Sequence, residues 1–334
     1  MKYENTLKYR SAWMGIAMLW VVVYHSFYIF PINFFKNIGY GGVDICLFAS
    51  GLGCYYSLCS NDDIAGFVKK RFLRIFPTYW CFLPFWFLYA FNAFDMDLSS
   101  VLGNILGIQN FTSKGLAFNW YISAILLFYI LAPYFKKLAD RFDGFKQILI
   151  VILMFAISVP FWSSNTLIIT VSRLPVFYIG MLFAKSSKKS KKLSAYKIVV
   201  YLLVSIAGFI LLWMSFEHFS DYRWTHALYW YPFILITPGL CVCVSVVMNL
   251  LDKSKVTSII PKIFSFIGKY SFEIYLTHIL IFDSVGYMVN SGTLPNEKTT
   301  YILALVSVPF ACAILFLITK GVTKLSSTIF LKKK

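Results

Sequence analysis

A histidine near the end of the first apolar run is the residue best suited to do chemistry. His25 ends the sequence Trp-Val-Val-Val-Tyr-His, which is otherwise apolar or aromatic. A neutral imidazole accepts protons near physiological pH, so it can serve as a general base or as a nucleophile. Ionisable residues inside a membrane span are costly and rare, and each is a hypothesis for a functional site. The alternative is a buried histidine that only hydrogen-bonds a neighbouring helix.

Asp44 lies in the second apolar run, directly after a glycine-rich sequence that starts at Gly39. Along a helix that rises 1.5 Å per residue, Asp44 lies roughly 9 Å from the outer end of its run, at a depth similar to that of His25. A carboxylate that accepts the imidazole N–H would fix the tautomer and leave the other ring nitrogen as a base. We predict that Asp44 orients His25. The alternative is a structural pair that only balances charge.

The composition places these residues in an integral membrane protein. Of the 334 residues, 59% are hydrophobic and only 13% are charged, whereas soluble domains carry about 25% charged residues. The formal net charge is +17, but most basic residues lie in short loops between apolar runs. That pattern sets membrane topology and gives no reason to expect a nucleic-acid partner. The seven cysteines lie in or beside apolar runs, so neither a disulfide framework nor a metal site is predicted.

Ten apolar runs predict an all-α fold, a polytopic transmembrane helical bundle of about ten spans. The basic residues gather at the N-terminus, in alternate loops and in the C-terminal tail, so both termini are expected to be cytoplasmic in a multi-pass protein of the plasma (inner) membrane. We expect one integral membrane domain over residues 1–334, with no appended soluble domain. Residues 101–111 are too short and glycine-rich to span, and fit an external interfacial or re-entrant segment. The ten runs are 11–30, 38–58, 75–94, 118–135, 147–163, 166–184, 196–216, 228–250, 270–289 and 299–319.

A guanidinium inside the sixth run adds to this polar set. Arg173 is roughly 16 Å from the cytoplasmic end of its run, so it needs a partner or a hydrated cavity. Glu273 and His278 of the ninth run are the predicted partners. Together with His25 and Asp44, these three residues place polar groups at successive depths across the membrane. This arrangement predicts one continuous hydrated passage.

Basic residues cluster where the third run begins. Lys69, Lys70, Arg71 and Arg74 lie within six residues of one another at the predicted cytoplasmic face. Guanidinium groups pair bidentately with phosphate, so the cluster could bind a phosphorylated ligand. The alternative is that the cluster only sets topology.

Two aromatic residues open the fourth run at its external end. Trp120 and Tyr121 could stack on a sugar ring, or they could belong to the interfacial belt of aromatic residues that membrane proteins carry. Both interpretations remain open.

Six stretches in order resemble the acyltransferase-3 family of integral-membrane O-acyltransferases, and together they cover nearly the whole chain. One departure is that the family commonly has an arginine eleven residues before the histidine, where this chain has Met14. Arg10 lies one turn earlier on the same helix face and could substitute for it by reaching inward. The stretches are GIAMLWVVVYHS (15–26), GYGGVDICLFASG (39–51), FVKKRFLRIFPTYW (67–80), NWYISAILLFYILAP (119–133), SRLPVFYIGMLFA (172–184) and GKYSFEIYLTH (268–278).

The resemblance implies an acyl donor taken from the cytoplasm, usually acetyl-coenzyme A (acetyl-CoA), and transfer to a hydroxyl of a cell-surface glycan or glycolipid precursor. Expected partners are therefore acyl-CoA, a glycan or glycolipid acceptor and membrane lipid. A homo-oligomer is also compatible with the sequence. No metal is expected. The predicted site residues are His25, Asp44 and Arg173 for catalysis, Arg10, Lys70, Arg71 and Arg74 for the cofactor, and Trp120, Tyr121, Glu273 and His278 for the substrate or tunnel.

Alternatives remain at two levels. Within an acyltransferase, His25 could act as a general base or carry the acyl group covalently, and the group could be acetyl or succinyl. Outside that class, ten spans with charges near the middle of the membrane also suit a transporter or flippase of a glycan precursor, or a membrane scaffold with incidental buried polar residues.

Overall fold

The computed structural model describes residues 3–331 except 27, 28, 32, 61, 62, 114–116, 165 and 191. These described residues form α-helices and three short 3-10 helices without any β-strand, so the predicted all-α helical bundle is confirmed. The elements are α1 (Tyr3–Lys8), α2 (Arg10–His25), α3 (Phe34–Asn37), η1 (Gly39–Gly41), α4 (Gly42–Ser60), α5 (Ile64–Ala93), α6 (Leu98–Ile105), α7 (Gln109–Thr112), α8 (Trp120–Arg141), α9 (Phe145–Ser158), η2 (Val159–Phe161), α10 (Leu167–Val171), α11 (Leu174–Lys189), α12 (Ala195–His218), η3 (Ser220–Tyr222), α13 (Pro232–Leu251), α14 (Ile259–Lys269), α15 (Ser271–Asn290) and α16 (Lys298–Leu331).

Every predicted apolar run overlaps a helix among the described residues. Within the described ranges, seven helical segments are long and apolar enough to cross a membrane, and they correspond to the second, fourth, sixth, seventh, eighth, ninth and tenth runs. The first and fifth runs correspond to the shorter helices α2 and α9, and the third run overlaps the second half of α5, which has 30 residues. The number of spans and the side on which each terminus lies stay predictions.

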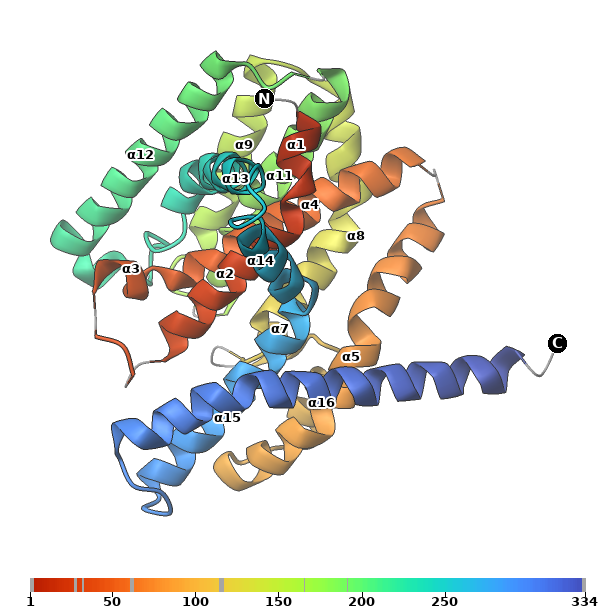
Figure 1. Ribbon diagram of the computed structural model, residues 1–334, viewed down its shortest axis with the longest axis vertical. Coiled ribbons are helices and arrows are strands. Elements are labelled where there is room, and N and C mark those ends of the chain that lie inside the picture. The colour runs from red at the N-terminus through yellow and green to blue at the C-terminus, as the bar shows by residue number, and fades with distance from the viewer. Residues whose placement is uncertain are drawn as a thin grey trace.

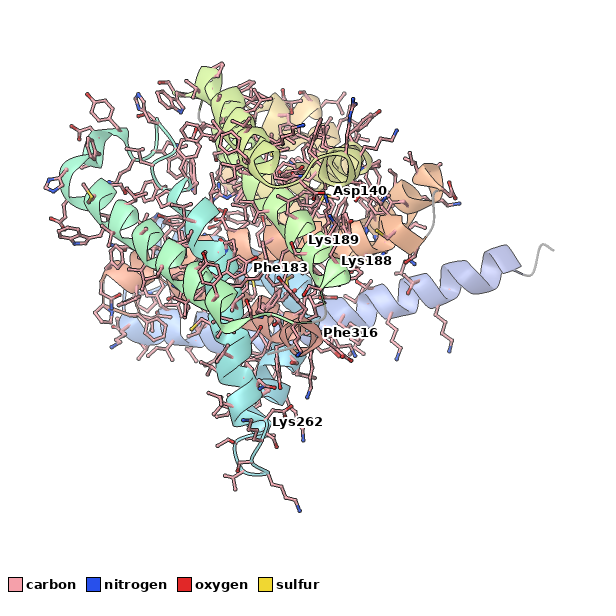
Figure 2. The ribbon with its side chains drawn as sticks, turned by 90° about the horizontal axis from the view of Figure 1, so that it is seen from above. Asp140, Phe183, Lys188, Lys189, Lys262 and Phe316 are labelled. Atoms are coloured by element: carbon pink, nitrogen blue, oxygen red, sulfur yellow. The ribbon has the colours of Figure 1, made fainter. Side chains whose placement is uncertain are left out.

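Close helix packing holds the centre of the bundle together. α2 packs along α14 and α4, α4 packs along α11, and α15 pairs with α16 (Figure 1). The contact between α4 and α11 is between backbones, because a side chain at Gly180 would run into the carbonyl of Phe48, and one at Gly51 would run into that of Phe177. Figure 2 shows the start of α14, marked by Lys262, standing away from the rest of the bundle.

The stretch predicted as interfacial or re-entrant folds into α6 and α7, which are too short to span a membrane. Between them Gly107 has a φ of +71°, which favours glycine. The stretch is tied to the neighbouring helices: Tyr79 donates to the Asn104 carbonyl at 2.7 Å, and Ser123 donates to that of Gly107 at 2.7 Å. α6 and α7 therefore lie against the middle of α5 and the first turn of α8.

Candidate active site

His25 and His278 form a contacting pair. His25 is the last residue of α2, and His278 lies in the middle of α15 with no exposed surface. The Nε2 atom of His278 lies 3.3 Å from Nδ1 of His25. Each Nδ1 also lies near a carbonyl of its own helix, at 3.0 Å from Val21 O for His25 and 2.8 Å from Ile274 O for His278.

These contacts select one tautomer for each neutral ring. Nδ1–H of His278 donates to Ile274, so Nε2 of His278 carries the lone pair. That nitrogen accepts from Nδ1–H of His25, which is shared with the Val21 carbonyl. Nε2 of His25 is then the nitrogen with a lone pair that can take a proton. The sequence predicted that a neighbouring side chain fixes the tautomer of His25, but it named Asp44, whereas the contact here is with His278.

Asp44 faces Arg173. Asp44 Oδ1 lies 3.3 Å from Arg173 Nε, and the two side chains are only 0% and 1% exposed. The guanidinium lies between the rings of Trp120 and Trp230, at 4.8 Å from each centroid. Arg173 also donates from Nη1 to the Ile169 carbonyl at 2.7 Å. The buried positive charge is therefore balanced by a carboxylate and covered by aromatic faces.

Two predicted contacts are therefore wrong. Neither carboxylate oxygen of Asp44 accepts a hydrogen bond within the described part of the chain, so Asp44 does not orient His25 through one. The ion-pair partner of Arg173 is Asp44, whereas Glu273 and His278 were expected to pair with it. The helical rise predicts a height along the helix axis, but it does not predict the side of the helix on which each group lies.

One large cavity, which we call the basic cavity, has a volume of about 520 Å³. Three of the four predicted cofactor residues line it, together with Lys269 and one acidic residue, Glu273. Lys70, the fourth, is exposed on α5 and does not line the cavity, and its role in cofactor binding stays a prediction. The three arginines are Arg10, Arg71 and Arg74.

Arg10 and Arg71 meet at the backbone of α4. Arg71 donates from Nη2 to the Gly53 carbonyl at 2.7 Å, and its guanidinium lies 5.6 Å from the Tyr129 ring. A Cβ atom at Gly53 would lie 2.8 Å from Nη2 of Arg10, so Arg10 reaches inward as predicted. Met14, where the family commonly has its arginine, lines the same cavity.

A second cavity, the histidine cavity, has a volume of about 700 Å³. His25 lines it together with the stacked rings of Trp86 and Phe118, whose centroids are 3.7 Å apart. It also contains polar side chains that the sequence analysis did not single out: Asn104, Gln109, Asp283 and Asn290. Asp283 could have been found as a further acidic residue within the ninth apolar run.

The predicted continuous passage is divided in this structure. The basic and histidine cavities share no lining residue among those described. Tyr121 and Tyr275, with ring centroids 5.3 Å apart, both line the basic cavity, and Tyr275 donates to the Phe118 carbonyl at 2.8 Å. Trp120 lines the histidine cavity instead, so the predicted sugar-stacking pair faces two different cavities.

A third, small cavity of about 150 Å³ lies between the two large ones. It shares Tyr275 with the basic cavity, and His25, Trp120 and Ile279 with the histidine cavity. Arg173 also lines it. The small cavity therefore shares lining residues with both large cavities. It also contains two of the predicted catalytic residues, His25 and Arg173.

The comparison with known families gives this geometry a context. A sequence model described as an acyltransferase domain, that of the acyltransferase-3 family, matches residues 14–319. No curated protein and no solved structure matches the chain. The family match includes both members of the histidine pair and every arginine described above except Arg10. Because it spans nearly the whole chain, the protein belongs to the acyltransferase-3 family of membrane acyltransferases.

Proposed function

We propose that this membrane acyltransferase transfers an acyl group, in the simplest case acetyl, from cytoplasmic acyl-CoA to a hydroxyl of a cell-surface glycan or glycolipid precursor. The observation that carries the proposal is the position of the histidine pair. His25 lines both the histidine cavity and the small cavity, and the small cavity adjoins the basic cavity at Tyr275. An acyl donor and a hydroxyl acceptor could thus approach His25 from opposite ends of the bundle.

The basic cavity suits the donor. CoA carries several phosphates, and Arg10, Arg71 and Arg74 bring guanidinium groups to one cavity that contains a single acidic side chain, Glu273, among its lining residues. Positive charge at this end also agrees with the predicted cytoplasmic side. We therefore assign the CoA headgroup to the basic cavity.

The histidine cavity suits a sugar. Its volume of about 700 Å³ accommodates a monosaccharide unit with room to spare. Trp86 and Phe118 offer aromatic surface, and Gln109 and Asp283 offer polar atoms for hydroxyl groups. This mixture of aromatic and polar groups supports a glycan acceptor.

In the proposed reaction, Nε2 of His25 takes the proton of the acceptor hydroxyl while the oxygen attacks the thioester carbonyl. The tetrahedral intermediate then expels the CoA thiolate, which takes the proton back from the imidazolium. His278 accepts a hydrogen bond from Nδ1–H of His25 throughout, and so favours the charged imidazolium. Arg173 lines the small cavity beside His25, where its charge could stabilise the oxyanion.

In a covalent version of the reaction, Nε2 of His25 attacks the thioester itself. CoA leaves as the thiolate, and Nδ1–H stays on the resulting acyl-imidazolium. The acceptor hydroxyl then attacks the acyl group and gives its proton to the CoA thiolate, which yields the ester, the CoA thiol and neutral His25. Trapping an acyl-imidazole on His25 with labelled acetyl-CoA in the absence of acceptor would favour this version, and its absence during turnover would favour direct transfer.

The test uses the full chain in membranes that contain its native acceptors, with labelled acetyl-CoA. His25→Ala is expected to lower transfer by about 10²–10⁴-fold, the range that a general base contributes. His218→Ala is the matched control, because His218 is exposed and lies outside the three cavities. Full activity of His25→Ala would reject both versions of the mechanism.

A transporter or flippase is the second candidate, and the divided passage is the observation that favours it. Two cavities separated by packed rings also fit a carrier that opens to one side at a time. Movement of the glycan precursor across proteoliposomes without consumption of acyl-CoA would support the transporter and contradict the proposed transfer.

A further inference from the structure

The small cavity between the two large ones has a size that limits what it can hold. Its volume of about 150 Å³ is similar to that of engineered apolar cavities that bind benzene. A group of up to about six non-hydrogen atoms would fill a space of that size. The rest of a CoA molecule is far too large for it.

The walls of the small cavity are mostly apolar. Val43 and Ile169 are 6% and 4% exposed, and tryptophan and tyrosine rings form much of the remainder. The one cation in the lining, Arg173, already has Asp44 as its counter-ion. A neutral, apolar group is therefore better matched to this cavity than an acyl group with its own carboxylate, such as succinyl.

We propose that the small cavity is the pocket for the acyl group of the donor, and that Ile169 and Val43 set the longest acyl chain that the protein accepts. The inference rests on the proposed function. A thioester entering past Tyr275 from the basic cavity would leave its acyl group beside His25, which lines the same small cavity. The cavity would take neutral acyl groups from acetyl to about pentanoyl, which has six non-hydrogen atoms.

Affinity as a function of acyl length tests the pocket without knowledge of the acceptor. Acetyl-, butanoyl-, pentanoyl-, hexanoyl- and octanoyl-CoA compete with labelled CoA for the purified full chain in detergent. Each methylene buried in the pocket should tighten binding about fourfold, which corresponds to about 0.8 kcal/mol. Affinity should stop rising near pentanoyl, where the pocket is full. We call the acyl length at which affinity stops rising the break.

Ile169→Ala should move that break to longer chains, by up to about the three carbon atoms that the substitution removes. Val43→Ile should move it to shorter chains. Ile168→Ala is the matched control, because Ile168 is a fully buried neighbour in α10 that does not line the small cavity. If Ile169→Ala does not fold, Ile169→Val removes one carbon and should shift the break by about one.

The possible results separate the two proposals. A break that moves in the Ile169 variants but not in Ile168→Ala supports the acyl pocket. Tight binding of CoA with no dependence on acyl length, or with the same break in every variant, overturns the pocket and leaves the proposed function standing. If neither CoA nor any acyl-CoA binds, both proposals are overturned.

Discussion

Nε2 of His278 lies 3.3 Å from Nδ1 of His25, although the two residues are 253 positions apart in the chain. α15 therefore has a role in the site, because its His278 is the hydrogen-bond acceptor that fixes the orientation of the His25 ring. The Val21 carbonyl alone could hold the same proton, but it lies on the same helix as His25. The His278 contact makes the orientation of His25 depend on how α2 and α15 pack.

His278→Ala should therefore lower kcat and leave the KM for acetyl-CoA unchanged. A hydrogen bond to a charged group is worth about 1.5–3 kcal/mol, so loss of the His278 acceptor should cost about 10–100-fold in kcat. Thr277→Val is the control, because Thr277 is a buried neighbour in α15 whose hydroxyl, within the described part of the chain, donates only to carbonyls of that helix. A kcat equal to that of the control would show that the pair has no part in turnover.

The arginines of the basic cavity should act on donor binding. Arg74→Gln should raise the KM for acetyl-CoA by about 10–100-fold with a smaller effect on kcat, because a charge-assisted hydrogen bond to phosphate is lost. Lys70→Gln removes the same charge from the same helix and, like Arg74, Lys70 is exposed, but it lies outside the cavity lining. Steady-state kinetics over a range of acetyl-CoA concentrations compares the two variants.

Equal effects of Arg74→Gln and Lys70→Gln would contradict a specific phosphate site in the basic cavity. Such a result would instead show that the cluster attracts the donor only through its total charge. Repeating the measurement at high salt distinguishes the two, because attraction between exposed charges is screened within about 10 Å at 0.1 M salt.

The Asp44–Arg173 pair should matter first for stability. Breaking a buried ion pair by removing one partner costs about 3–5 kcal/mol, because the other charge stays buried without its counter-ion. Asp44→Asn should therefore lower the unfolding temperature in detergent much more than Asp143→Asn, which affects a carboxylate that is 68% exposed. The double variant Asp44→Leu/Arg173→Met should lose less stability than the sum of its single changes.

A different result would restore the role that the sequence suggested for Asp44. If Asp44→Asn kept full thermal stability but lost kcat, Asp44 would be acting on the reaction, either on His25 itself or through its ion-pair partner Arg173, which lines the small cavity beside His25. The present geometry favours the route through Arg173, since neither Asp44 oxygen accepts a hydrogen bond in the described part of the chain.

Much of this architecture was predictable from the sequence. The apolar runs located the helices because length and hydropathy determine which segments can be buried in lipid. The inward position of Arg10 followed from counting one helical turn back from Met14, and both residues line the basic cavity. His25 was recognisable as an ionisable residue in an otherwise apolar run.

The contacts across the bundle were not predictable in the same way. Residue counting gives height along a helix axis, but partners also depend on rotation about that axis and on breaks in the helix. The run predicted as 166–184 breaks after α10, and Arg173 caps α11 two residues before Pro175. In a continuous helix Pro175 would have no N–H to donate to the carbonyl of Val171, where α10 ends, and its ring would clash with that carbonyl, which accounts for the break. The sequence does not show that Arg173 would turn toward Asp44.

The division of the passage was also hidden from the sequence. Polar groups at successive depths suggested one continuous passage, whereas Tyr121 and Tyr275 pack against each other between the basic cavity and the histidine cavity. Ring packing of this kind depends on side-chain directions from α8 and α15, which spacing along either helix cannot provide.

The backbone contact between α4 and α11 gives a prediction that is independent of the chemistry. Gly180→Ala should destabilise the protein, because the added Cβ would run into the Phe48 carbonyl and neither helix can move without disturbing the Asp44–Arg173 pair. Gly321→Ala is the matched control: Gly321 also lies inside a helix, but a Cβ there meets nothing within 4 Å. It should be neutral or stabilising by up to about 1 kcal/mol, through better helix propensity. Thermal unfolding of both variants in the same detergent provides the comparison, and equal unfolding temperatures would show that α4 and α11 have room to separate.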